Sequence, residues 1–199
     1  MKLYESLPKG ITVNGRFFKC DFDFRNVLKM LDIMQREDIV PDARDYHCAK
    51  CLISHRMPLK TASEAYKVIC DLLFEKPPET DAKRLTSFEQ DAPLIRAAFK
   101  QVYGIDLFRD RLTWFEFIDY LHGLPEGNRY EDVIGIRAKP LPAPTKYNAK
   151  EREWLMKAKQ SVALHLTEAE AAKKYDSDAS RLFAGIMSMI PKDGEQVGE

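Results

Sequence analysis

Apolar residues recur every three or four positions along most of this chain, which is the spacing of an amphipathic helix. The pattern predicts helices over residues 24–34, 41–54, 61–73, 88–103 and 112–122, with a short helical turn at 130–136. Residues 11–20 differ, because two short apolar runs flank Asn14-Gly15, a strong signal for a type I′ hairpin turn. The sequence therefore predicts a mainly α fold: a helical domain with a small N-terminal β-hairpin and a C-terminal helical extension.

Polar residues at fixed positions predict where several of these helices begin. Asp23 follows the hairpin and is a good N-cap for the first helix. Thr61 and Glu64 have the spacing of a capping box, in which each side chain binds the other residue's backbone amide. Ser87 and Gln90 have the same spacing and predict the start of a later helix at residue 88.

Residues 88–124 are the most informative segment of the chain. Gly104 follows an apolar stripe at helical spacing and is expected to end that helix in a left-handed conformation. The next helix is apolar nearly all round, so it is expected to be covered on several sides. Its aromatic cluster, Trp114, Phe115 and Phe117, is predicted to belong to the core, with an exposed binding surface as the alternative.

Three prolines within residues 138–145 predict an extended, semi-rigid linker. This linker divides the chain into a helical core domain with the hairpin, 1–137, and a helical extension, 146–199. Within the extension, residues 149–162 are expected to form a helix with Trp154, Leu155, Ala158 and Val162 on one face, and residues 182–190 carry a second apolar stripe. Each stripe needs an apolar surface to cover, on the core domain, on a second copy of the chain or on another protein.

Charge limits the classes of partner. The chain has 31 basic and 31 acidic residues, and neither 1–145 nor 146–199 has a basic excess, so nucleic acid is not expected as a partner. No apolar run approaches the roughly 20 residues needed to span a bilayer, so no membrane association is expected. The N-terminal segment lacks the apolar core of a signal peptide, which predicts a cytoplasmic protein whose four cysteines stay reduced.

The strongest candidate for chemistry is the segment HCAKCLISH, with His47, Cys48, Cys51 and His55. If the whole segment is helical, Cys48, Cys51 and His55 share one face and can converge on a metal ion. A structural zinc site, however, usually takes four ligands from two separated pairs, and only one pair is present. Cys48 and Cys51 also lie on the apolar stripe of the helix. They are therefore predicted to be buried structural thiols that face the hairpin, with a metal or thiol site as the alternative.

Other titratable residues have structural explanations. Asp21 and Asp23 can in principle act as an acid–base pair, but a strand-to-helix junction explains one as the cap and the other as a favourable charge at the helix N-terminus. His122 lies at a helix C-terminus, where the helix dipole favours a cation. This explains the residue better than a role as a catalytic base does. The sequence thus predicts no catalytic, cofactor-binding or metal-ligating residue, and no enzymatic activity.

Two short motifs carry a family resemblance. YGIDL at Tyr103–Leu107, followed by LTWFEF at Leu112–Phe117, resembles the bacteriophage gene-product-fifteen family. Members are encoded in the tail-gene clusters of long-tailed phages and prophages of Gram-positive bacteria, near the tape-measure gene, and the resemblance covers about residues 1 to 160. Thr113 and Phe115 stand where the family usually has His and Trp.

The resemblance implies a non-enzymatic role in phage tail morphogenesis in the host cytoplasm. The favoured hypothesis is a tail assembly chaperone that binds the tape-measure protein, a long helical chain that would aggregate uncovered, with tail-tube protein as a second client. One alternative is a structural virion component of the tail or neck. The other, from a different class, is a metal or thiol enzyme that uses the His47–His55 segment.

Overall fold

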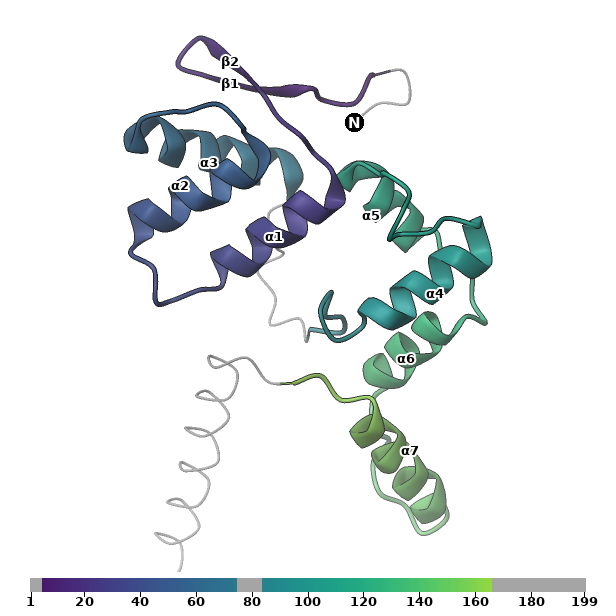
Figure 1. Ribbon diagram of the computed structural model, residues 1–199. Coiled ribbons are helices and arrows are strands. Elements are labelled where there is room, and N and C mark those ends of the chain that lie inside the picture. Colours follow the sequence, from purple (N-terminus) through teal and green to yellow (C-terminus); the bar gives the residue numbers. More distant parts are fainter. Residues whose placement is uncertain (1–4, 75–83, 166–199) are drawn as a thin grey trace, which may run out of the picture. The chain divides into compact units, whose positions relative to one another are not determined.

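The computed structural model describes residues 5–74 and 84–165, and these residues form two strands and seven helices (Figure 1). The elements are β1 Gly10–Val13, β2 Arg16–Lys19, α1 Phe24–Met34, α2 Pro41–Leu52, α3 Leu59–Leu73, α4 Ala92–Tyr103, α5 Trp114–His122, α6 Arg129–Ala138 and α7 Ala149–Ser161. The predicted mainly α fold with an N-terminal hairpin is confirmed. The described residues up to Val162 belong to one compact unit. The predicted stripe at 182–190 lies outside the described residues, and the predicted division at 138–145 stays a prediction.

The hairpin has the turn that its sequence predicts. β1 and β2 pair antiparallel with Ile11 opposite Phe18, and both side chains are buried. Asn14 has φ 50° and Gly15 has φ 75°, the two positive φ angles that a type I′ turn requires. β1 packs on α3, and the Asn14 side-chain amide donates a hydrogen bond to the Glu64 carboxylate. The hairpin is therefore held by the helix beneath it.

Helices α1, α2 and α3 pack consecutively, α1 on α2 and α2 on α3 (Figure 1). The Asp23 carboxylate accepts a hydrogen bond from the Arg25 backbone amide at 3.0 Å, so the predicted cap of α1 is confirmed. α1 turns Phe24, Val27 and Met30 into the core. α1 therefore contributes its apolar face to the packing.

The predicted start of α3 is wrong. The helix begins at Leu59, three residues earlier than a cap at Thr61 predicts, so Thr61 lies within its first turn instead of capping it. Pro58 occupies the N-cap position with φ −63° and ψ 152°. The proline ring carries no hydrogen-bond acceptor, so the chain enters the helix there without a side-chain cap.

The predicted start of α4 is also wrong, by four residues. The Ser87 hydroxyl accepts a hydrogen bond from the Gln90 amide at 3.3 Å, as an N-cap would, but residues 88–91 form a turn. α4 begins at Ala92, after Asp91. Its far end is as predicted, because Gly104 has φ 71° and its amide donates to the Lys100 carbonyl.

The start of α5 is fixed by a capping box between Thr113 and Glu116, which the sequence reasoning missed. Two backbone hydrogen bonds join this start to the start of α1: Phe24 donates to the Leu112 carbonyl and Trp114 donates to the Phe22 carbonyl. The Phe117 ring stacks on Phe24 at 4.7 Å between centroids. α1 and α5 thus share one aromatic core.

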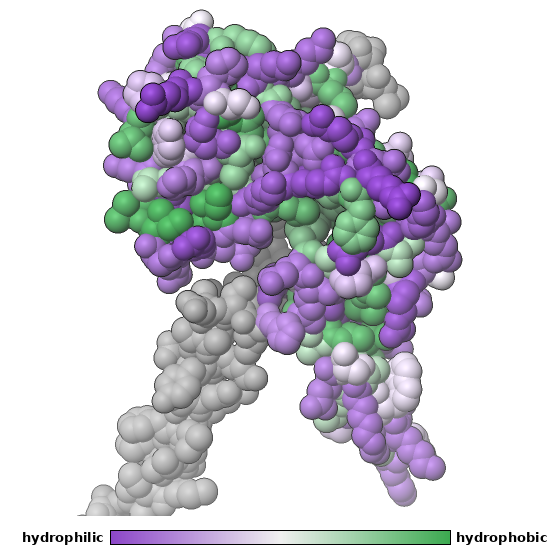
Figure 2. All heavy atoms as spheres, viewed as in Figure 1, coloured by the Kyte–Doolittle hydropathy of each residue, from purple (hydrophilic) through white to green (hydrophobic). Residues whose placement is uncertain are grey.

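α6 packs on α4, and α7 packs on α6 (Figure 1). α6 has ten residues and is longer than the predicted turn at 130–136. The Asn128 side chain caps this helix by accepting a hydrogen bond from the Glu131 amide at 3.1 Å. α7 buries Leu155, while the outer surface of this part of the molecule is largely hydrophilic (Figure 2).

Candidate functional site

The predicted metal-binding face does not form on α2. The helix ends at Leu52, because Ile53 has an extended backbone with φ −112° and ψ 111°. His55 therefore lies beyond the helix and does not share a face with Cys48 and Cys51. The two histidines are exposed, whereas Cys48 is fully buried and Cys51 is half-buried against the core.

Cys48 is a buried thiol, as predicted, but it faces α1 where the sequence reasoning expected the hairpin. Its sulfur donates to the Met30 carbonyl at 3.7 Å. Burial raises the pKa of Cys48 to about 12, so the thiol is protonated at neutral pH. Since the thiolate is the nucleophile and the metal ligand, this environment favours a structural thiol. Within residues 5–74 and 84–165, no group of three or more His, Cys, Asp or Glu residues is placed to hold a metal ion.

Asp21 and Asp23 are paired with arginines at the junction of the hairpin with α1. Both oxygens of the Asp21 carboxylate accept hydrogen bonds from Arg111 Nη2 at 3.1 Å, and Asp23 Oδ2 accepts one from Arg111 Nε at 3.2 Å. Arg25 Nη2 donates to the Leu107 carbonyl at 2.9 Å while its Nη1 donates to Asp23. These contacts join the junction to the loop between α4 and α5, which supports the structural interpretation of both carboxylates.

The aromatic cluster of α5 belongs mostly to the core. Trp114 is only 4% exposed and Phe117 is buried, while Phe115 is half-buried. The Trp114 indole Nε1 donates to the Leu73 carbonyl at 3.3 Å, which satisfies its polar atom at the end of α3. His122 is exposed in the last turn of α5, where the dipole of the helix favours a cation.

A buried ion pair between α4 and α6 was missed by the sequence reasoning. Arg137 donates to both oxygens of Asp91, at 2.7 Å and 2.8 Å, and also to the carbonyls of Leu85 and Val162 at 2.9 Å and 2.6 Å. Burial by itself would raise the pKa of Asp91, but the hydrogen bonds from Arg137 and from the Ser87 amide outweigh it and lower that pKa. One guanidinium thus holds α6, the start of α4 and the end of α7 together.

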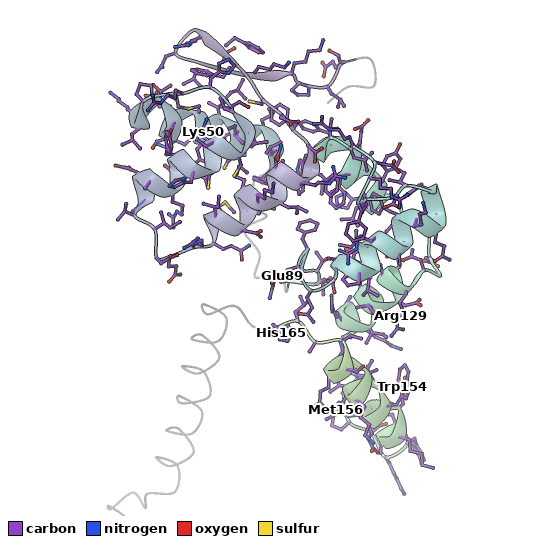
Figure 3. All side chains as sticks on the ribbon, in the orientation of Figure 1. Lys50, Glu89, Arg129, Trp154, Met156 and His165 are labelled. Atoms are coloured by element: carbon purple, nitrogen blue, oxygen red, sulfur yellow. The ribbon has the colours of Figure 1, made fainter. Side chains whose placement is uncertain are left out.

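α7 presents an aromatic side chain to solvent. Trp154 is 61% exposed, whereas its neighbour Leu155 is 1% exposed and forms the contact with the core. The sequence predicted an apolar face that includes both residues; the fold covers Leu155 and leaves Trp154 exposed, since adjacent residues on a helix point about 100° apart. Figure 3 shows Trp154 and Met156 on opposite sides of α7, with both side chains directed away from the helix axis. Tyr147, just before the helix, is 92% exposed.

Two lysines flank the exposed tryptophan on α7. Lys150 lies four residues before Trp154 and Lys157 three residues after it, so all three share one side of the helix. Tyr147 lies in the turn just before the N-terminus of α7, three residues before Lys150. We refer to these four residues, Tyr147, Lys150, Trp154 and Lys157, as the Trp154 face. It combines two exposed aromatic side chains, of types enriched among the residues that dominate binding energies at protein interfaces, with two lysines.

Comparisons with known proteins place the chain in a family. In the part of the chain that the structure describes, no helix is long and apolar enough to cross a membrane. No curated protein and no solved structure matches the sequence. Residues 3–164, which include every helix and strand described above, match the family model described as Bacteriophage Gp15 protein. The chain therefore belongs to the Bacteriophage Gp15 protein family.

Proposed function

We propose that this protein is a non-enzymatic morphogenesis protein of a phage tail, and that it acts as an assembly chaperone for the tape-measure protein. Membership in a bacteriophage protein family supports a structural or morphogenetic role. The observation that carries the finer proposal is the exposed tryptophan of α7. Tryptophan is strongly enriched among the residues that dominate binding energies at protein interfaces.

The surroundings of Trp154 suit it to binding another protein. α7 is anchored through buried Leu155 and through the Val162 carbonyl, which accepts from Arg137. These contacts fix the position of the helix, so Trp154 is held at a defined place on the surface. Covering an aromatic side chain removes apolar area from water at about 25 cal/mol per Å², which favours association with an apolar helical client. Tail-tube protein is a second client that the same surface could serve.

The candidate catalytic groups support a role without catalysis. The high pKa of Cys48 keeps its thiol protonated, and Asp21 and Asp23 are engaged by Arg25 and Arg111. These are properties of groups that stabilise a fold. A general base or a nucleophile needs a pKa near the working pH and a free lone pair.

Co-expression with the tape-measure protein of the same phage tests the proposal. The wild-type protein is expected to raise the soluble fraction of the tape measure and to co-purify with it. Trp154→Ala should abolish both effects, whereas Phe17→Ala, at a matched side chain that is 60% exposed on β2, should retain them. Equal activity of the two variants would contradict a role for α7, and no effect of the wild-type protein would contradict the chaperone function.

Mass spectrometry of purified virions separates the chaperone from a structural component of the tail or neck. A chaperone leaves the particle, so its peptides should be absent from mature virions. A fixed copy number in every virion would assign the protein to the particle instead.

A further inference from the structure

We infer that the Trp154 face binds an acidic amphipathic helix whose carboxylates lie about seven residues apart on either side of an apolar residue. This inference rests on the proposed function, because it takes a segment of a protein client as the ligand. It adds the chemistry that the client segment must have and the residues that recognise it.

The spacing of the lysines sets the geometry of the ligand. Lys150 and Lys157 are seven residues apart on α7, which corresponds to about 10 Å along the helix axis. Trp154 lies between them, and exposed Tyr147 precedes the helix. A helix packed alongside α7 presents side chains at the same seven-residue repeat. Carboxylates at that repeat can meet both lysines while an apolar residue between them covers Trp154.

The charge around the face calls for an acidic ligand. Residues 139–160 contain six basic and two acidic residues, although the whole chain has a net charge of zero. Two of these basic groups bind backbone carbonyls, Arg152 that of Pro142 and Lys159 that of Arg137. This local excess was hidden in the balanced totals for residues 146–199. It attracts negative charge by complementarity.

The ion pair on α7 itself leaves Lys157 available to a ligand. Its ammonium lies 2.7 Å from Glu153, but both side chains are well exposed. An exposed pair four residues apart on a helix contributes little to stability, so a carboxylate of the client can replace Glu153 at small cost. Glu153 then turns to solvent.

A protein helix fits this face better than a phosphate-bearing partner does. Glu151 and Glu153 are interleaved with the lysines on α7, and both would repel a continuous line of phosphates. A membrane surface would require apolar side chains gathered on one side of the helix, whereas Trp154 and Met156 point in opposite directions (Figure 3). Discrete carboxylates can avoid the two glutamates, because a peptide carries its charges only at chosen positions.

The test uses the full-length chain and two labelled peptides. The first is an amphipathic helical peptide with a leucine stripe and Glu at a seven-residue repeat, and the second has Lys in place of each Glu. Fluorescence anisotropy should show at least tenfold tighter binding of the Glu peptide, weakening as salt is raised. Trp154→Ala should reduce that affinity at least tenfold, whereas Phe17→Ala should not. Lys150→Glu combined with Lys157→Glu should reverse the preference between the peptides, and circular dichroism confirms that each variant is folded.

Several results would overturn the inference. Equal binding of both peptides, or binding that survives Trp154→Ala, would remove the face as the site. Binding of a dT oligonucleotide or of phosphatidylserine vesicles in preference to the Glu peptide would assign it to nucleic acid or lipid. A dimer in sedimentation that Trp154→Ala dissociates would assign it to a second copy, whose residues 166–199 include seven acidic and four basic residues. If the Glu peptide binds as expected but the tape measure does not co-purify, the inference stands and the chaperone proposal fails.

Discussion

Replacing Arg137 by methionine should strongly destabilise the protein. The substitution keeps most of the side-chain volume but removes every hydrogen bond of the guanidinium. Four are lost: two to the Asp91 carboxylate and one each to the carbonyls of Leu85 and Val162. Asp91 is 1% exposed, so its charge remains buried with only its bonds to the Ser87 amide and the Thr86 hydroxyl.

The magnitude follows from the burial of that charge. Removing one partner of a buried ion pair costs about 3–5 kcal/mol, since the remaining charge is neither solvated nor neutralised. Domains are stable by only about 5–15 kcal/mol, so the loss is a large part of the total. At roughly 2–4 °C per kcal/mol for a chain of this size, the melting temperature should fall by about 10 °C.

Urea unfolding followed by far-ultraviolet circular dichroism measures the change. Arg129→Met, an exposed position on the same helix, is the control and should shift the free energy of unfolding by less than about 0.5 kcal/mol. The double variant Asp91→Leu with Arg137→Met should recover part of the loss, because it removes the isolated charge. If Arg137→Met alone lowers the free energy of unfolding by less than about 1 kcal/mol, the conclusion that this buried ion pair stabilises the fold is refuted.

The other substitutions address separate parts of the structure. Trp114→Ala should cost about 3–5 kcal/mol in urea unfolding, because it empties a buried aromatic site; an unchanged midpoint would place the side chain at the surface. Gly104→Ala should cost about 1 kcal/mol in the same assay, since φ 71° strains any residue with a Cβ although no neighbouring atom obstructs one. Cys48→Ala with Cys51→Ala should lower the melting temperature modestly and leave binding of the client intact, and stoichiometric zinc in the wild-type protein would contradict the structural role of these thiols. Because the folded state lowers the pKa of Asp91, this carboxylate stabilises the protein above its unfolded pKa of about 4 and stops doing so as the pH falls through the lower folded value. Between pH 5 and pH 2, the stability of Asp91→Asn should therefore depend less on pH than that of the wild-type protein.

The features that the sequence predicted correctly are those with a local cause. Asn14-Gly15 suits positive φ at two adjacent residues, whatever the hairpin packs against. Asp23 caps α1 by binding an amide two residues away, and Gly104 ends α4 through a contact within the same turn. Each of these signals is complete within about five residues, so neighbouring elements did not alter the outcome.

The features that the sequence did not reveal depend on distant partners. Arg137 and Asp91 are 46 positions apart, and an arginine on a short helix looks the same whether it is buried or solvated. The same pair helps to explain the late start of α4. The Asp91 carboxylate accepts a hydrogen bond from the Ser87 amide, and this bond fixes a turn where a helix was expected. Propensity and spacing describe one segment at a time. These interactions depend on how three segments of the chain are placed relative to one another.

Under the proposed function, α7 combines the two roles that the sequence reasoning set against each other, permanent packing and a surface for a client. Leu155 packs on the core, and Arg137 and Lys159 exchange hydrogen bonds between α6 and the end of α7. Trp154, one residue from Leu155, points to solvent. Deleting residues 146–199 would consequently remove stabilising contacts together with the proposed binding surface, so loss of tail assembly in that deletion would not locate the site. Trp154→Ala removes the exposed aromatic group and leaves Leu155 in place, and it is therefore the change that separates binding from folding.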